Sequence, residues 1–304
     1  MRRWLWWTIQ LVVAAIVIRM VWATLARNWS EFRSLHLTLQ PQIGWIGLAV
    51  VVLLISYASS VEAWRRILAG WHQHLPYMRA ARIWLVANLG RYIPGKVWSV
   101  AGLMALAQRS GVEAWAAGAS AFAIQAVAIG TAVAIVAVAI PGAESPLRLA
   151  AAALVAMLTI ASLAWPRAVQ TLARLVGRPE RVRPLPVAAV AESSALGIFS
   201  WLGHGTAFWL LSRGLGLPGT LPVTTAVGVF ALGYILGLLA LFAPGGVGVR
   251  EVVLISLLTP MLGGGGAIAL SLASRLLLTV TEVAAPLAML LATRQQKEDV
   301  SVRT

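Results

Sequence analysis

The sequence predicts an all-helical protein that crosses a membrane several times, with about six full spans and two broken or re-entrant helical hairpins in an inverted-repeat architecture. The first observation is composition. Of the 304 residues, 60% are hydrophobic and 11% are charged, whereas soluble domains carry roughly 25% charged residues. The second is a set of runs without Asp, Glu, Lys or Arg, several of which reach the roughly 20 residues that a membrane-spanning helix needs. These runs are residues 34–61, 114–143, 149–166, 193–212, 214–249 and 252–274. The third is a pair of similar Pro-Gly sites that interrupt apolar segments.

Hydropathy and helix-breaking residues place the full spans in order. They are expected at about 4–26, 43–62, 114–140, 147–165, 193–212 and 267–292. The basic start followed by an apolar run resembles a secretory signal peptide. The apolar character continues past Arg19 to Ala26, so we expect a first span that is retained. The four glycines at 263–266 predict a corner before the last span.

The two Pro-Gly sites divide the remaining apolar segments, 78–109 and 222–262. Proline clashes with a continuing helix, and glycine adopts the left-handed conformation that ends one. The residues at the breaks are Pro94, Gly95, Pro244, Gly245, Gly246 and Gly248. The flanking pieces are too short or too interrupted for ordinary spans, so we expect each segment to be a broken or re-entrant hairpin. Irregular backbone is tolerated at membrane depth only where protein buries it or a wet cavity adjoins it.

The surroundings of the two sites are similar and predict a repeat. Each site follows an apolar helix and precedes a short apolar helix and a long span. Three full spans separate the hairpins, an odd number, so the hairpins are expected to enter from opposite faces. We expect a single transmembrane domain over 1–304, with halves at about 43–140 and 193–292 and a basic cytoplasmic connection at about 166–192. Inverted repeats bind their ligands near the midplane, at discontinuous helices.

The net charge of +14 is distributed unevenly along the chain. Of the 24 basic residues, 14 fall in segments expected on the cytoplasmic side and four in segments expected outside. The positive-inside rule then predicts a multi-pass protein of the inner (cytoplasmic) membrane with both termini in the cytoplasm. The basic residues are scattered between apolar runs, so no nucleic-acid partner is expected. The sequence predicts no particular oligomeric state.

Cofactor chemistry has no support in the residue types. The chain has no cysteine, which excludes disulfides and thiolate ligands. Its four histidines lack metal-ligand spacing. The sequence therefore predicts no metal, no cofactor and no catalytic residue, and we do not expect an enzyme.

Ionisable residues at expected membrane depth are the candidate binding residues. A charge there costs from about 2.5 kcal/mol upward and usually faces a cavity or a partner. The candidates are Arg91, Lys96, Arg250, Glu251, Arg275 and Glu282. Arg91 and Lys96 flank the first break, where the start of a helix adds backbone donors for an anion.

The last span carries a polar stripe. Arg275, Thr279 and Glu282 are spaced by four and then three residues, which places them on one helix face. We expect that face to turn inward, with Arg250 and Glu251 as its partners. The glutamates would hold the arginines in place or bind a cationic head group.

Three further polar residues lie near apolar helices. Glu113 is expected to cap a helix, and Gln125 to bond to a neighbouring helix. His204 lies between Gly203 and Gly205, which favours close helix packing.

Two motifs resemble one known family. Residues 243–254 read APGGVGVREVVL and precede a small-residue corner and Ser274-Arg275, while residues 88–98 contain RYIPGKVW. The motifs resemble those of the transmembrane region of lysylphosphatidylglycerol synthases, also called flippase-like membrane proteins. The resemblance extends over nearly the whole chain. The resemblance implies a membrane domain that moves lipids between leaflets. Synthases of this family add a soluble aminoacyltransferase domain, and because this chain ends at Thr304, we do not expect the synthase activity. The matching positions are Arg91, Pro94, Gly95, Pro244, Gly245, Gly246, Gly248, Glu251 and Arg275.

The function expected from these observations is lipid translocation. Membrane lipids are the expected partners, and the substrate would be an anionic or aminoacylated head group of a phospholipid or a polyprenyl-phosphate glycolipid. It would cross through a polar cavity at the midplane. Two alternatives stay open: an ion-coupled small-solute transporter, and a membrane subunit or enzyme of lipid-linked glycan assembly.

Overall fold

The computed structural model describes residues 41–92, 97–139, 145–164, 183–217, 219–240, 246 and 248–302. These residues form helices and connecting segments without a strand, which confirms the all-helical class. The expected first span at 4–26 lies outside the described residues, as does most of the expected basic connection. Five of the predicted break and binding residues also lie outside them: Pro94, Gly95, Lys96, Pro244 and Gly245.

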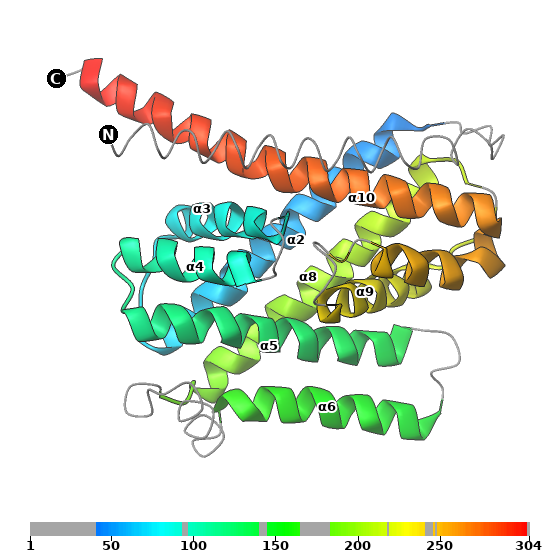
Figure 1. The fold of residues 1–304 in the computed structure, drawn as a ribbon, viewed down its shortest axis with the longest axis horizontal. Coiled ribbons are helices and arrows are strands. Elements are labelled where there is room, and N and C mark those ends of the chain that lie inside the picture. Colours follow the sequence, from blue (N-terminus) through cyan, green and yellow to red (C-terminus); the bar gives the residue numbers. More distant parts are fainter. Residues whose placement is uncertain are drawn as a thin grey trace.

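The described helices follow the order expected from the hydropathy pattern (Figure 1). They are α2 (Ile43–Gly70), α3 (Tyr77–Asn88), the 3₁₀ helix η1 (Leu89–Tyr92), α4 (Val97–Arg109), α5 (Ala114–Ala139), α6 (Pro146–Ala164), α8 (Val187–Gly214), α9 (Val223–Leu239) and α10 (Val249–Val302). Gly263 has non-helical dihedrals (φ 70°, ψ 164°) and bends α10. The predicted corner before the last span is therefore confirmed.

Within the described ranges, three stretches have the length and apolar character to cross a membrane: Ile43–Gly70, Ala114–Ala139 and Val249–Met289. The apolar helix Val223–Leu239 is shorter. The chain is a multi-pass membrane protein. Many of its large apolar side chains are exposed on the outside of the helices, among them Phe122 and Val138, which is 76% exposed.

Helix α2 continues past the expected end of its span at residue 62. The carboxylate of Glu62 lies 2.7 Å from Arg65 Nε and 2.6 Å from Arg66 Nε. Arg66 also lies 3.0 Å from Glu192, which belongs to the early part of α8. Because these charges compensate one another, the helix continues through a sequence that hydropathy alone would end.

Helices α2 and α8 form the most extensive helix pair of the fold. Small residues allow the approach: a Cβ on Gly203 would collide with Ser56. Hydroxyl groups join the helices, with Ser59 Oγ donating to Leu196 O at 2.8 Å and Ser193 Oγ donating to Ala63 O at 3.0 Å. Small residues and side-chain hydrogen bonds are how membrane helices associate.

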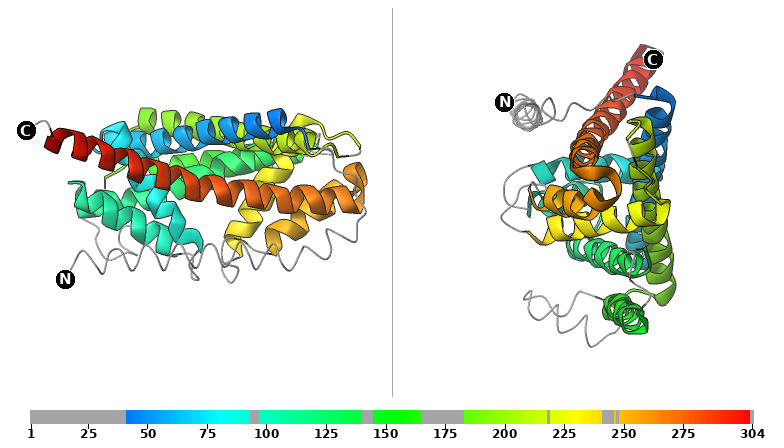
Figure 2. Two further views of the ribbon diagram at one scale, coloured as in Figure 1. Left: turned by 90° about the horizontal axis from the view of Figure 1, so that it is seen from above. Right: turned by 90° about the vertical axis from the view of Figure 1, so that its right-hand side faces the viewer.

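The two expected hairpins are present as helix pairs around this central α2–α8 pair. Helices α3 and α4 lie side by side towards one end of the long axis, and α9 with the first part of α10 lies towards the other (Figure 1). After the Gly263 bend, the long second part of α10 crosses back over the molecule and contacts α3 (Figure 2).

Candidate functional site

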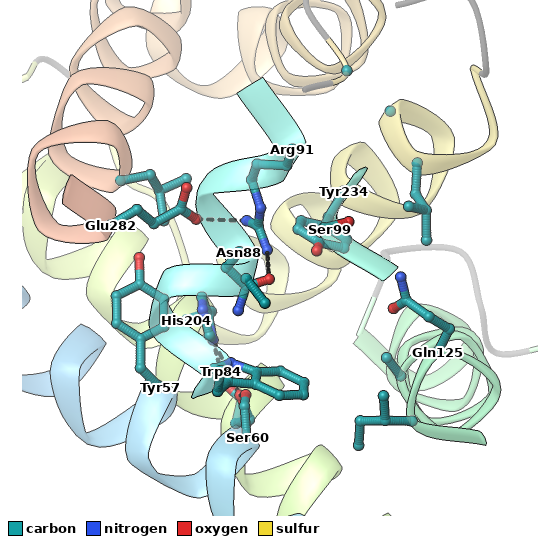
Figure 3. Close-up of a pocket in the computed structure, with 18 of the residues that line it drawn as sticks. Tyr57, Ser60, Trp84, Asn88, Arg91, Ser99, Gln125, His204, Tyr234 and Glu282 are labelled. Carbon is teal, nitrogen blue, oxygen red and sulfur yellow. Dashed lines mark hydrogen bonds and ion pairs between the residues drawn. The ribbon is translucent and has the colours of Figure 1, made fainter. Parts of the chain in front are cut away.

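A cavity of about 220 Å³ lies where the two hairpins meet (Figure 3). Its walls come from α2, α3, η1, α4, α5, α8, α9 and α10. Its polar lining includes Tyr57, Ser60, Asn88, Arg91, Tyr92, Ser99, Gln125, Ser200, His204, Tyr234, Arg250, Arg275, Thr279 and Glu282. Four of the six predicted binding residues line it. A fifth, Glu251, contacts the lining residue Arg275, and Lys96 lies outside the described residues.

The first hairpin is joined to the last helix by an ion pair. Arg91, on η1, places Nη1 2.6 Å from Glu282 Oε1 and Nη2 2.9 Å from Asn88 Oδ1. The hydroxyl of Tyr92 donates to Glu282 Oε2 at 2.6 Å. Both carboxylate oxygens of Glu282 are thus engaged, and the side chain is only 10% exposed. The pair fixes η1 against the second part of α10.

One of the two partners predicted for the polar stripe of the last span is correct. Arg275 pairs with Glu251 as predicted, whereas Glu282 pairs with Arg91 and not with Arg250. Glu282 lies seven residues beyond Arg275, which is roughly 10 Å along a helix. That distance takes it away from the start of α10 and places it beside η1.

The second hairpin is joined to the same helix by the Glu251–Arg275 pair, at 2.5 Å. The other carboxylate oxygen of Glu251 accepts the backbone N–H of Gly248 at 2.7 Å. Gly248 has φ 87° and precedes the first residue of α10, so Glu251 reaches back to the helix start in the manner of a capping box. The carboxylate therefore both caps α10 and holds Arg275.

Arg250 differs from the other two arginines, because no described carboxylate forms an ion pair with it. The residue is 7% exposed. Its Nη2 donates to Ser274 Oγ at 3.3 Å, its guanidinium lies 4.9 Å from the centre of the Phe230 ring, and its Nε has no hydrogen-bond partner among the described residues. Burying a charge without a counterion is strongly unfavourable. The cavity thus contains a cation that an anionic ligand would neutralise.

Gly246 brings the second break against α9. It has φ 72°, and a Cβ built on it would lie 2.9 Å from Gly237 Cα. Both glycines line the cavity. Gly246 and Gly248 both have the positive φ that favours glycine, and both lie between α9 and α10.

The predicted close packing around His204 is confirmed: a Cβ on Gly205 would collide with Val227, as one on Gly203 would with Ser56. His204 itself lines the cavity, with Nδ1 2.8 Å from Ser200 O. Its ring lies 5.4 Å from Tyr57 and 5.8 Å from Phe230, centre to centre.

The other two weaker candidates have different positions. Gln125 lines the cavity. Glu113, expected to cap a helix, directly precedes α5. Its carboxylate accepts hydrogen bonds from the side chains of Trp115, at the start of α5, and of Gln73, which lies between α2 and α3. Glu113 lies outside the cavity lining.

Apart from Gln125, His204 and Thr279, sequence reasoning did not single out the uncharged polar and aromatic part of the lining. It includes Tyr57, Ser60, Trp84, Asn88, Ser99, Ser200, Trp201, Phe230 and Tyr234. Such residues are frequent in apolar helices and carry little signal alone. A usable signal is their helical spacing, because Phe230, Tyr234 and Gly237 recur at four and three residues on one face of α9.

Comparison with known families gives one match. The model described as the lysylphosphatidylglycerol synthase TM region matches residues 7–285. The matched range contains both hairpins and all six predicted binding residues. Comparison with proteins of curated function gives no match.

Proposed function

The chain belongs to the family of the lysylphosphatidylglycerol synthase transmembrane region, and we propose that it is a lipid translocator. In this proposal, the head group of an anionic or aminoacylated lipid crosses between leaflets through the central cavity while the apolar tails stay in the bilayer. The observation that carries the proposal is the cationic cavity at the meeting of the two hairpins, lined by Arg91, Arg250 and Arg275. The proposed activity is transport and involves no covalent step on the substrate.

The charge placement supports a ligand-binding role. Ionisable residues inside membrane domains are rare and mark substrate pathways or paired structural sites. Two of the arginines are paired with glutamates, so pairing alone explains their burial. Arg250 is buried without such a partner among the described residues, and a lipid phosphate would supply one.

The arrangement of the helices supports alternating access between two related halves. A pseudo-two-fold axis between the halves would relate α2 to α8 and α5 to the second part of α10. It would also relate the α3–α4 hairpin to the pair formed by α9 and the first part of α10. If the halves are related in this way, the contact between α5 and α9 corresponds to the contact between α10 and α3. Both contacts are present. We propose an inverted repeat whose halves rock against each other around the cavity, in an inner membrane with both termini cytoplasmic.

Reconstituted protein tests the proposal. Vesicles containing the protein and fluorescently labelled phosphatidylglycerol are treated with an impermeant quencher, and the rate at which inner-leaflet label becomes accessible is measured. Arg275→Ala and Glu251→Ala should lower that rate at least tenfold, because each leaves its partner unpaired at the cavity. Arg213→Ala is the matched control, since Arg213 lies over the Trp209 ring outside this cavity. Folded variants of both residues that move lipid at the wild-type rate would show that the site is misassigned.

A further inference from the structure

We infer that the cavity selects a lipid with a single phosphodiester charge and a neutral, hydroxyl-rich head group, and that Arg250 is the ligand of its phosphate. This inference rests on the proposed translocation and narrows its substrate class. Three features of the cavity carry it: the unpaired arginine, the paired state of both glutamates, and the uncharged lining.

The charge balance of the cavity calls for one negative charge. Its described charged residues are three arginines and two glutamates, counting Glu251 behind Arg275. Two arginines are matched by the two glutamates, which leaves the charge of Arg250. A phosphodiester carries one negative charge at neutral pH and offers two oxygens in a plane that suits the guanidinium fork. One such group would neutralise the net charge of these described residues.

The same pairing disfavours a cationic head group. Glu282 accepts from both Arg91 and Tyr92, and Glu251 accepts from Arg275 and the backbone of Gly248. An incoming ammonium group would have to displace an arginine from one of these carboxylates. No other carboxylate lies among the described residues that line the cavity. An aminoacyl ester such as a lysyl group, which adds two positive charges, therefore lacks an acceptor here.

The rest of the lining fits a neutral head group with hydroxyls. Asn88, Ser99 and Gln125 come from three different helices and offer amide and hydroxyl groups, which both donate and accept hydrogen bonds (Figure 3). Trp84 and Tyr234 add ring faces on which the C–H groups of a polyol can lie. Glycerol and sugar head groups share this chemistry, so both a phosphatidylglycerol-type phospholipid and a polyprenyl-phosphate sugar match it.

A binding measurement on the full chain in detergent tests the selection. Trp84 and Trp201 line the cavity, so their fluorescence reports occupancy. The probes are dioctanoyl phosphatidylglycerol, dioctanoyl lysylphosphatidylglycerol and a short-chain prenyl phosphomannose. At least one of the two neutral-head phosphodiesters should bind tenfold or more tightly than the lysyl ester, and the tighter of the two identifies the lipid source. Equal or tighter binding of the lysyl ester, or binding of neither phosphodiester, would overturn the inference.

Arg250→Met isolates the phosphate contact. Methionine keeps an unbranched apolar stem and removes the unpaired charge. The midpoint of thermal unfolding without lipid should therefore equal or exceed that of the wild type. The affinity for the preferred phosphodiester should fall at least tenfold. A purely structural role for Arg250 predicts the reverse: a lower midpoint and unchanged affinity in the folded fraction. Arg213→Met is the control and should bind like the wild type. If the methionine variant does not fold, Arg250→Lys keeps the charge, loses the fork, and should still weaken binding severalfold.

The outcomes separate this inference from the proposed function. Transport of lysylphosphatidylglycerol in preference to phosphatidylglycerol would refute the selection and leave translocation intact. Selective, Arg250-dependent binding without movement of any of these lipids would keep the inference for the site and refute translocation.

Discussion

The two hairpin breaks carry similar Pro-Gly sequences, yet their arginines have opposite environments. At the first, Arg91 is neutralised by Glu282 and held by Asn88. At the second, Arg250 has only Ser274 as a hydrogen-bond acceptor among the described residues, because the adjacent Glu251 pairs with Arg275. The arginines differ in position as well, because Arg91 lies three residues before Pro94 and Arg250 lies six residues after Pro244. Among the described residues, the first cation is therefore saturated and the second is not. Under the proposed function, the first break attaches η1 to α10 and the second break binds the ligand.

Loss of the carboxylate at the first break should have the largest effect on stability. Glu282→Gln leaves Arg91 and Tyr92 facing a neutral amide, and removing one partner of a buried ion pair costs roughly 3–5 kcal/mol. We expect a loss near the lower end of that range, because Arg91 is 28% exposed. Reversible unfolding in mixed detergent micelles measures it.

The double variant Arg91→Met/Glu282→Gln provides the control. Once the buried charge is removed with its partner, the double variant should be more stable than Glu282→Gln alone. If the two losses simply add, Arg91 and Glu282 do not act as a pair.

The close approach at the second break gives the next largest effect. Gly246→Ala forces a Cβ against Gly237 Cα at a residue with φ 72°, and a non-glycine residue in such a conformation costs roughly 1–3 kcal/mol before any clash. The variant should unfold at lower temperature and move lipid more slowly, because the start of α10 shifts. Thermal unfolding and the vesicle transport assay measure both effects.

Gly264→Ala, within α10, is the matched control. A Cβ at Gly264 meets nothing within 4 Å. Its stability should be unchanged or higher by less than about 1 kcal/mol. Equal losses at both glycines would refute the close-approach explanation.

The smallest effects concern the neutral ligands of the two arginines. Ser274→Ala and Asn88→Ala each remove one hydrogen bond to an arginine, which is worth about 0.5–1.5 kcal/mol. Ser274→Ala also removes the hydrogen bond that Ser274 Oγ donates to Ser271 O. Arg91 keeps Glu282 after Asn88→Ala, so affinity for phosphatidylglycerol should change less than twofold. Arg250 keeps no described acceptor after Ser274→Ala, so affinity should fall about threefold as the guanidinium loses its orientation. The reverse order, measured by fluorescence titration, would show that the first break binds the lipid.

Features with a local cause were predictable from the sequence. The helices follow hydropathy and the corner follows four glycines, since each depends on residues within one or two turns. The spacing of Arg275, Thr279 and Glu282 correctly predicted a shared inward face.

Features that depend on long-range packing were not predictable. Arg91 and Glu282 are 191 positions apart, and nothing near either residue indicates that they pair. The extension of α2 beyond residue 62 depends on compensation of Glu62 by Arg65 and Arg66, which a count of charges treats as an interruption. Most of the aromatic and hydroxyl lining was missed because each such residue is ordinary in an apolar helix.

The most direct test compares rates of phosphatidylglycerol movement in vesicles containing wild-type protein, Arg250→Met or Arg213→Met. We predict that the wild type and Arg213→Met accelerate movement well above protein-free vesicles, whereas Arg250→Met, although folded, falls to within a few-fold of the protein-free rate. Wild-type movement by folded Arg250→Met would contradict the assignment of the second break as the binding site.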